Sequence, residues 1–379
     1  MTLNAHWSYP TSIRFGVGRL SELAATLAEA GIHRPLFVTD RALLAMPMTQ
    51  QARALLGDME YATFAEVDSN PSDINLTAAI KTFNDNQCDG AIAFGGGSCM
   101  DLAKLTVFMA RQKRPVWDFE DIGDWWRRAD ADVIFPLVAV PTTAGTGSEV
   151  GRAGVLTDSQ NKVKKIIFHP QMLPRDVICD AALTAGAPPH LTAGAGMDAL
   201  AHCLEAYCSP NYHPMSQGIA LEGMRLALTH LPRVFADGGN LASRAQMMSA
   251  ASMGAVAFQK GLGAIHALSH PIGARYNTHH GMTNAIVMPA VLRFNRAAIE
   301  AKIAAAAAYM GIDGGFDGFY EHICCLLQTL QIPAKLRDLG VDDASIDDLA
   351  AMAVEDPSAA GNPVPLDADS AKQLFRECI

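Results

Sequence analysis

The sequence predicts an α/β domain with a parallel sheet, followed by an all-helical domain. Three observations support this prediction. Strand-like apolar runs alternate with helix-like segments in the first half of the 379-residue chain, as in βαβ units. The second half consists of long segments rich in Ala, Leu and Met, with few β-branched runs. This change of character begins near Pro188, so the predicted domains are residues 1–187 and 188–379.

Composition and charge narrow the functional class. Half of the residues are hydrophobic and 18% are charged, so a sizeable core is available and disorder is not expected. The net charge of −10 argues against a nucleic-acid partner, which needs a basic surface. We expect neither a signal peptide at Met1–Pro10 nor a membrane partner, because no apolar run reaches about 18 residues. Eight cysteines without a C-x-x-C pair predict reduced thiols in a cytoplasmic protein.

The elements of the first half follow from apolar runs and their boundary residues. A short strand and turn near Ile13 should lie at the edge of the sheet, where pairing across a two-fold axis would give a homodimer. A helix is expected to end at Gly31, and another to begin near Ser72. The expected elements, in order, are the strand and turn 13–18, helix 19–30, strand 35–40, helix 72–86, strand 89–94, the loop and helix 95–104, and the apolar run 133–140.

Two polar loops of the first half suit a dinucleotide. Gly95-Gly-Gly-Ser98 follows a strand and opens a helix, whose free N–H groups favour a phosphate. It is not a G-x-G-x-x-G motif, since Met100 fills the last glycine position, and Lys104 lies too far along for a Walker lysine. The loop Pro141–Ser148 follows the next apolar run, and Asp40 ends an earlier strand. An acid there accepts a bond from a ribose hydroxyl and repels a 2′-phosphate, which favours NAD over NADP.

A carboxylate and several imidazoles in the helical half suggest a metal site. Asp198 and His202 are four residues apart, so a helix places both on one face. Four of the chain's twelve histidines follow in the stretch 261–281: His266, His270, His279 and His280. One carboxylate with three imidazoles suits Fe²⁺ or Zn²⁺, although spacing alone does not choose which three histidines bind. Pro271 and Gly273 are expected to break the helix, which leaves His279 and His280 on a turn or at the next helix start.

These motifs carry a resemblance that runs nearly end to end. The chain resembles the iron-containing (group III) alcohol dehydrogenases, within the dehydroquinate synthase-like fold. The resemblance rests on Gly95–Ser98 with Asp101 and Lys104, Pro141–Glu149, Gly196–His202, His266-x3-His270-Pro, Tyr276–Gly281 and Gly361-Asn-Pro363. It implies an α/β nucleotide domain and a helical domain with the active site in the cleft between them.

The resemblance also implies residue roles, carried over by position. The implied metal ligands are Asp198, His202, His266 and His280. His270 then lies beside the metal as a catalytic proton-relay or orienting group. The implied cofactor-binding residues are Asp40, Gly96, Gly97, Ser98, Thr142, Thr143, Thr146 and Lys164. Several positions depart from the family pattern. Gly151 follows Val150 where threonine is common, His279 replaces a proline and could compete with His280, and Cys99 and Met100 replace smaller or aliphatic residues.

The resulting hypothesis is a metal-dependent alcohol dehydrogenase or aldehyde reductase that transfers hydride between NAD(H) and a small alcohol/aldehyde pair. One alternative is a dehydroquinate synthase-like lyase, which needs a basic phosphate pocket; the helical half offers few arginines near its motifs. A second is a zinc polyol dehydrogenase, which usually shows only two histidines with the aspartate. A nucleotide- or metal-sensing protein is the non-enzyme alternative, and it would have lost metal ligands that this chain retains.

Overall fold

The chain folds into two compact units, each with its own core. The computed structural model describes residues 5–7 and 11–379. The first unit runs up to residue 143 and resumes at 147–186, while the second comprises 144–146 and 187–379. The first is α/β and the second is helical, which confirms the predicted fold class. Within the described residues, none of the helices has both the length and the apolar character that a membrane crossing requires.

The first unit is built on a seven-stranded sheet of order β1-β2-β9-β6-β5-β3-β4. Six neighbouring strands are parallel, and β1 alone pairs antiparallel. A separate antiparallel pair, β7–β8, completes the described strands. The bounds are β1 Ala5–Trp7, β2 Ser12–Phe15, β3 Pro35–Val38, β4 Ala62–Phe64, β5 Gly90–Gly95, β6 Leu137–Pro141, β7 Ala153–Asp158, β8 Val163–Phe168 and β9 Asp176–Cys179.

The prediction that the strand near Ile13 lies at the sheet edge was wrong. Strand β2 pairs with β9 on one side and with β1 on the other, so Ile13 lies between Trp7 and Val177. The three residues of β1 are too few to give a period-two pattern in the sequence, so only the tertiary pairing reveals this strand. The original reason for a homodimer is therefore lost.

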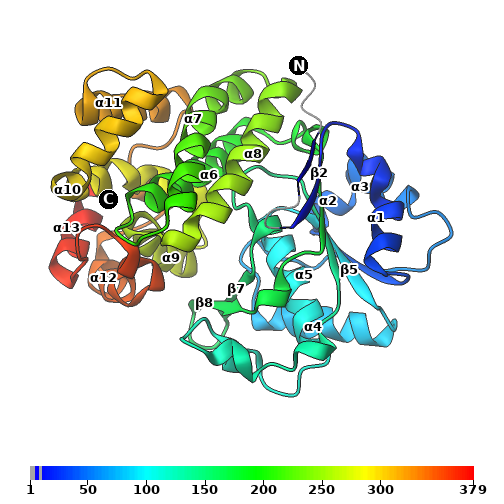
Figure 1. Cartoon of the computed structure of the whole chain (residues 1–379). Coiled ribbons are helices and arrows are strands. Elements are labelled where there is room, and N and C mark those ends of the chain that lie inside the picture. The colour runs from blue at the N-terminus through cyan, green and yellow to red at the C-terminus, as the bar shows by residue number, and fades with distance from the viewer. Residues whose placement is uncertain (1–4, 8–10) are drawn as a thin grey trace. The chain divides into compact units, whose positions relative to one another are not determined.

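Helices of the first unit begin and end largely where local chemistry predicts. Gly31 closes α1 with a left-handed φ of 75°, and Ser72 forms a capping box with Asn75 at the start of α4. The first turn of the predicted helix 19–30 is instead a 3₁₀ turn, Arg19–Glu22. The α-helices are α1 Leu23–Ala30, α2 Arg41–Leu44, α3 Pro47–Ala54, α4 Asp73–Asp85 and α5 Gly97–Met109 (Figure 1).

Apolar residues on the central strands form the core of this unit. Ile92 and Phe94 on β5 share one cluster with Leu23 and Leu27 on α1. Helix α5 packs against β5 and β6 and is itself almost wholly buried. A parallel sheet covered by helices in this way needs strands without a polar face. That requirement explains the continuous apolar runs from which β3, β5 and β6 can be predicted.

The second unit contains helices only, as predicted. Helix α6 packs against α7, α8 and α10 (Figure 1). Glycines permit these close approaches: a Cβ on Gly196 would lie 2.2 Å from a Leu231 methyl. The helices are α6 Pro189–Cys208, α7 Pro214–Ala236, α8 Leu241–Ala257, α9 Ala264–Tyr276, α10 His280–Met310, α11 Gly315–Thr329, α12 Ile346–Glu355 and α13 Ala368–Cys378.

The prediction that Pro271 and Gly273 break the helix was wrong. Helix α9 continues through both residues and ends at Tyr276, and its C-cap Asn277 adopts a left-handed φ of 52°. A proline removes one backbone bond from the helix, and the packing of buried α9 against α10 and α12 outweighs that loss. His279 is the N-cap of α10 and His280 its first residue, as expected.

Candidate metal and nucleotide sites

Three helices of the second unit bring a carboxylate and three imidazoles together. Helix α6 carries Asp198 and His202 on one face, α9 carries His266, and α10 begins with His280. Oδ1 of Asp198 lies 3.8 Å from Nε2 of His202, 3.7 Å from that of His266 and 3.5 Å from that of His280. Asp198, His202 and His266 are buried, with 3%, 6% and 1% of their surface exposed.

The spacing of these atoms fits a divalent metal ion. Ligand atoms about 2.1 Å from an ion at tetrahedral corners lie about 3.4 Å from one another, close to the separations seen here. The ligand atoms of Asp198, His202 and His266 all fall within 4.8 Å of one another. Nδ1 of His202, within this group, and Oδ1 of the neighbouring Asn284 are buried and have no hydrogen-bond partner among the described residues. The donor set, the distances and the burial together suit Fe²⁺ or Zn²⁺.

The charges within this group are strongly coupled. Burial would raise the pKa of Asp198, but the imidazoles of His202, His280 and His266 hold it well below its usual range. Burial lowers the pKa of His202 to about 4, so this imidazole is neutral at pH 7. Burial opposes a charge on His266 as well, yet Glu205 and Asp198 outweigh it and raise its pKa to about 10.

Three polar residues contact the candidate ligands or the neighbouring His270, although the sequence predicted no role for them. Oε2 of Glu205 lies 2.5 Å from Nδ1 of His266, and Asn284 donates to Oδ1 of Asp198 at 2.8 Å. Asp356 lies 2.8 Å from Nδ1 of His270. Glu205 could have been found, because it falls one turn after His202 on the same face of α6. Asp356 has no such signal, since it follows α12, far from His270 in the chain.

The remaining histidines of the 261–281 stretch have distinct surroundings. The ring of His270 stacks on that of His280, with centroids 5.3 Å apart and an interplanar angle of 13°. His270 is thus beside the candidate ligands, and its Nδ1 faces Asp356. Burial would raise the pKa of Asp356, but His270 and the backbone of Ser358 lower it. His279 accepts from the N–H of Met282 at 3.4 Å and so caps α10.

Most of the predicted nucleotide-binding residues gather at one edge of the sheet of the first unit. Asp40 follows β3, Gly96 to Ser98 follow β5, and Thr142 and Thr143 follow β6. These three strands are parallel neighbours, so their carboxyl ends meet at the same edge. The N–H of Thr142 donates to the carbonyl of Gly95 at 2.9 Å, which joins two of the loops directly. Such an edge is where α/β sheets bind nucleotides.

Local backbone geometry explains the glycines at this edge. Gly95 has a φ of 153°, and a Cβ there would lie 2.5 Å from Sγ of Cys99. Gly96 is the N-cap of α5 and offers no side chain to its first turn, which leaves N–H groups for an anion. Oδ1 of Asp40 accepts from the N–H of Leu43 and caps α2. The hydroxyl of Ser98 donates to the carbonyl of Ser69 at 2.6 Å.

Asp101 and Lys104 hold the loop that follows β6. Lys104 is buried, with 1% of its surface exposed. Its Nζ donates a hydrogen bond to Oγ of Ser148 at 2.6 Å. Asp101 accepts from the same hydroxyl and, at 3.0 Å, from the N–H of Val155.

Two predicted cofactor residues lie outside the cluster at the sheet edge. Thr146 falls in 144–146, which group with the helical unit, and Lys164 lies on β8, in the separate two-stranded sheet.

Two family models together cover almost the whole chain. The model described as "Iron-containing alcohol dehydrogenase" matches residues 10–181. The model described as "Fe-containing alcohol dehydrogenase family, C-terminal" matches residues 192–379. The chain belongs to the iron-containing alcohol dehydrogenase family. The resemblance inferred from the motifs is therefore confirmed.

Individual members of this iron-containing alcohol dehydrogenase family match over nearly their full lengths. A 4-hydroxybutyrate dehydrogenase from Cupriavidus necator is 37% identical, over 98% of this chain and 99% of the relative. An NAD-dependent methanol dehydrogenase from Bacillus methanolicus is 30% identical, over 98% of both chains. The crystal structure of a 1,3-propanediol oxidoreductase matches with a TM-score of 0.92 and 33% identity, over all of both chains.

Family membership establishes the class of reaction. The protein is a metal-dependent alcohol dehydrogenase, an oxidoreductase that transfers hydride between NAD and an alcohol/aldehyde pair. Iron and NAD are its cofactors, and the second unit contains a group of side chains suited to a metal ion. The lyase and sensor alternatives gain no support, because the matching relatives named above are dehydrogenases and an oxidoreductase.

Proposed function

We propose that the iron of this dehydrogenase is bound by four side chains from three helices: Asp198, His202, His266 and His280. The observation that carries this proposal is the convergence of three Nε2 atoms on one buried carboxylate oxygen, at 3.5–3.8 Å. Zn²⁺ accepts the same ligands. The catalytic and metal-binding domain is proposed as residues 188–379, and the dinucleotide-binding domain as residues 1–187.

When bound, the metal supplies a Lewis acid that polarises the carbon–oxygen bond of the substrate, and NAD supplies the hydride acceptor. The chain's own residues must then hold the ligand geometry and move a proton. His270 is proposed for the second task. Its Nδ1 is held by Asp356, and its side chain is 16% exposed. Nε2 of His270 can therefore take the hydroxyl proton of the alcohol and pass it to water.

Changing His270 to alanine is expected to leave the metal in place and to slow turnover by about 100-fold, because a general acid–base group typically contributes at least that much. Metal content and the rate of NADH oxidation measure the two effects separately. The matched control is Asp356→Asn, which keeps the imidazole and weakens only its orientation, and should cost less activity. Loss of the metal in His270→Ala would instead make His270 a ligand.

Metal binding is expected to weaken as the pH falls. In the metal-free protein the raised pKa of His266, about 10, keeps this imidazole protonated at neutral pH. A metal must displace that proton, so the apparent affinity should rise about tenfold for each pH unit between about pH 7 and 9. The lowered pKa of His202 contributes nothing in this window. A chelator competition titration measures the slope, and an affinity independent of pH would contradict the prediction.

We propose that the nucleotide is bound by the residues predicted from the sequence: Asp40, Gly96, Gly97, Ser98, Thr142, Thr143, Thr146 and Lys164. The bare N-terminus of α5 at Gly96 supports a phosphate position. The carboxylate of Asp40, two residues after β3, supports a ribose position and a preference for NAD over NADP. The proposal places the pyrophosphate over the ends of β5 and β6.

The proposed substrate is a short primary alcohol, or its aldehyde, with a second polar group at its far end. The relatives named after 4-hydroxybutyrate and 1,3-propanediol support this class, since both compounds have that form.

A cytoplasmic location is also proposed, because all eight cysteines are free thiols. The homodimer stays a prediction. We propose no nucleic-acid or membrane partner.

Protein purified without oxygen provides the test. Its iron content is measured first, followed by NADH oxidation with the aldehydes of 4-hydroxybutyrate and 1,3-propanediol. Propanal, which lacks the second polar group, is the matched control. One iron per chain with faster turnover of the two functionalised aldehydes is expected. Equal rates for propanal would remove the substrate class, and bound metal without any aldehyde reduction would overturn the proposed residue roles.

A further inference from the structure

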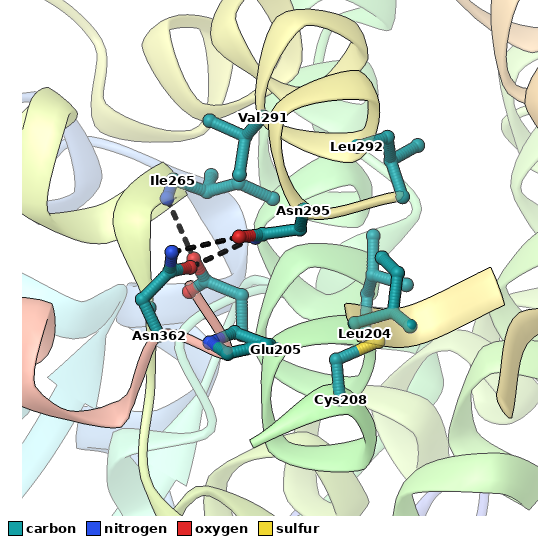
Figure 2. Close-up of a pocket in the computed structure, with 11 residues that line it drawn as sticks. Leu204, Glu205, Cys208, Ile265, Val291, Leu292, Asn295 and Asn362 are labelled. Atoms are coloured by element: carbon teal, nitrogen blue, oxygen red, sulfur yellow. Dashed lines mark hydrogen bonds between the residues drawn. The ribbon is translucent and has the colours of Figure 1, made fainter. Parts of the chain in front are cut away.

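Glu205 is a buried acid with no lysine or arginine partner among the described residues. It lies on α6, one turn after His202, and only 6% of its surface is exposed. Its surroundings are largely apolar and include Leu204, Ile265 and Val291, as Figure 2 shows. Burying a carboxylate in such a place is costly unless hydrogen bonds compensate for the lost water. Among the described residues, the compensating hydrogen bonds come from the first turn of α9.

Both oxygens of Glu205 are occupied by N–H donors of α9. Oε1 accepts from the backbone N–H of Ile265 at 2.6 Å and more weakly from that of His266 at 3.4 Å. Oε2 lies 2.5 Å from Nδ1 of His266. The N-terminus of a helix carries a partial positive charge, which attracts a carboxylate. A carboxylate whose other oxygen already accepts from backbone N–H groups is best satisfied here as an acceptor, so we assign the hydrogen between the two side chains to Nδ1.

Asn362 completes this unusual helix start. The N-cap of α9 is Gly263, which has no side chain to offer. Asn362 accepts from the N–H of Ala264 at 3.0 Å and exchanges two hydrogen bonds with Asn295 (Figure 2). A Cβ on Gly263 would lie 2.8 Å from Oδ1 of Asn362 and 3.1 Å from Oε1 of Glu205. The close packing leaves Glu205 little freedom to turn away.

We propose that Glu205 is a positioning residue for the metal, acting through His266. By holding the hydrogen on Nδ1, it leaves Nε2, which lies 3.7 Å from Oδ1 of Asp198, as the nitrogen that gives up its proton to a metal ion. It also fixes the orientation of the ring, because the same carboxylate accepts a hydrogen bond from the backbone N–H of His266. Carboxylates that bond the far nitrogen of a ligating histidine act in this way in many metal sites. This inference rests on the proposed assignment of His266 as a metal ligand.

Glu205→Gln tests the inference with almost no change in shape. If the glutamine oxygen keeps its bond to Ile265, its NH₂ group faces Nδ1 of His266 and favours the tautomer with a hydrogen on Nε2. The affinity for Co²⁺ or Zn²⁺ is therefore expected to fall about 10- to 100-fold. Chelator competition measures the affinity, and the visible absorption spectrum of the Co²⁺ protein reports the ligand geometry. Neither measurement depends on turnover.

Asn362→Ala is the control for a merely structural role. It removes a cap from the same helix start without touching His266, so it should lower the melting temperature yet change the metal affinity less than threefold, within about 0.6 kcal/mol. If Glu205→Gln does not fold, Glu205→Asp replaces it, with a carboxylate one methylene shorter and a weakened metal affinity expected. Wild-type affinity in the Glu205 variant, or an equal loss in Asn362→Ala, would overturn the proposal.

The proposed ligand set and the proposed role of Glu205 can be refuted separately. Wild-type protein that turns over aldehydes and yet binds no metal through His266, as judged by His266→Ala, would refute the proposed ligand set. Wild-type protein that loses metal in His266→Ala but keeps it fully in Glu205→Gln would refute only the role of Glu205.

Discussion

Asp198→Asn is expected to yield a folded protein that retains no metal and has no dehydrogenase activity. Oδ1 of Asp198 is the atom toward which Nε2 of His202, His266 and His280 all point. The substitution removes the one negative charge in contact with all three. Breaking a buried charged pair typically costs about 3–5 kcal/mol, which corresponds to a loss of affinity of roughly 100- to 4,000-fold. Elemental analysis after dialysis measures the metal, and circular dichroism confirms the fold.

Asp347→Asn is the matched control for that experiment. Asp347 is also helical and pairs with Lys372, but 80% of its side chain is exposed, so its removal should change neither metal content nor activity. A fully metallated and active Asp198→Asn protein would contradict the ligand assignment. Retained metal with lost activity would mean that Asp198 serves the reaction without holding the ion.

Gly281→Ala is expected to damage the packing that brings the candidate ligands together. A Cβ at this position would lie 1.9 Å from the carbonyl oxygen of Gly194 and 3.2 Å from Cβ of Asp198. No rotamer relieves a clash with a backbone carbonyl, so α6 and α10 must separate. Overpacking typically costs about 1–3 kcal/mol, and this contact belongs at the upper end or beyond. Denaturant unfolding measures the stability, and metal affinity should fall with it.

Gly218→Ala provides the opposite expectation on a neighbouring helix. A Cβ there meets nothing within 4 Å, and the residue lies inside α7 with no positive φ. Alanine should therefore stabilise the protein by about 0.5–1 kcal/mol through its better helix propensity. If Gly281→Ala were as stable as the Gly218 variant, the helices carrying Asp198 and His280 would have to tolerate displacement, and the metal site would not depend on their contact.

Much of the fold could be predicted because its signals are local. The continuous apolar runs of β3, β5 and β6 reflect a sheet covered by helices, and Gly31 and Ser72 mark helix ends through their own backbone chemistry. The strands β1, β4 and β9 were not predicted, although β9 is as long as the predicted strand β3. Their stability comes from pairing with distant segments, as in the register of Ile13 with Val177. No short window of sequence contains that information.

In the candidate site as well, residues with a local sequence signal could be predicted, and residues from remote segments could not. Asp198 and His202 are readable because helical spacing puts them on one face, and the 261–281 stretch is readable because it is rich in histidine. Pro271 misled the helix assignment, since tertiary packing outweighed one lost backbone bond. Asp356 contacts His270 from a segment that is remote in the sequence, so the residues around Asp356 in the sequence do not indicate this contact. Residues that touch the chemistry through another residue were the ones that sequence patterns missed.

The loop after β6 belongs to both halves of the molecule. Thr142 and Thr143 belong to the first unit, whereas residues 144–146 belong to the helical unit. The chain returns to the first unit at Gly147. Within the helical unit, Gly145 packs against α6 so tightly that a Cβ would lie 2.9 Å from Cα of Ala195, one turn before Asp198. This loop therefore contains two proposed nucleotide-binding residues, Thr142 and Thr143, and a glycine that packs on the helix carrying Asp198. Thermodynamic linkage then requires reciprocity: by whatever factor metal alters the dissociation constant of the dinucleotide, the dinucleotide alters that of the metal.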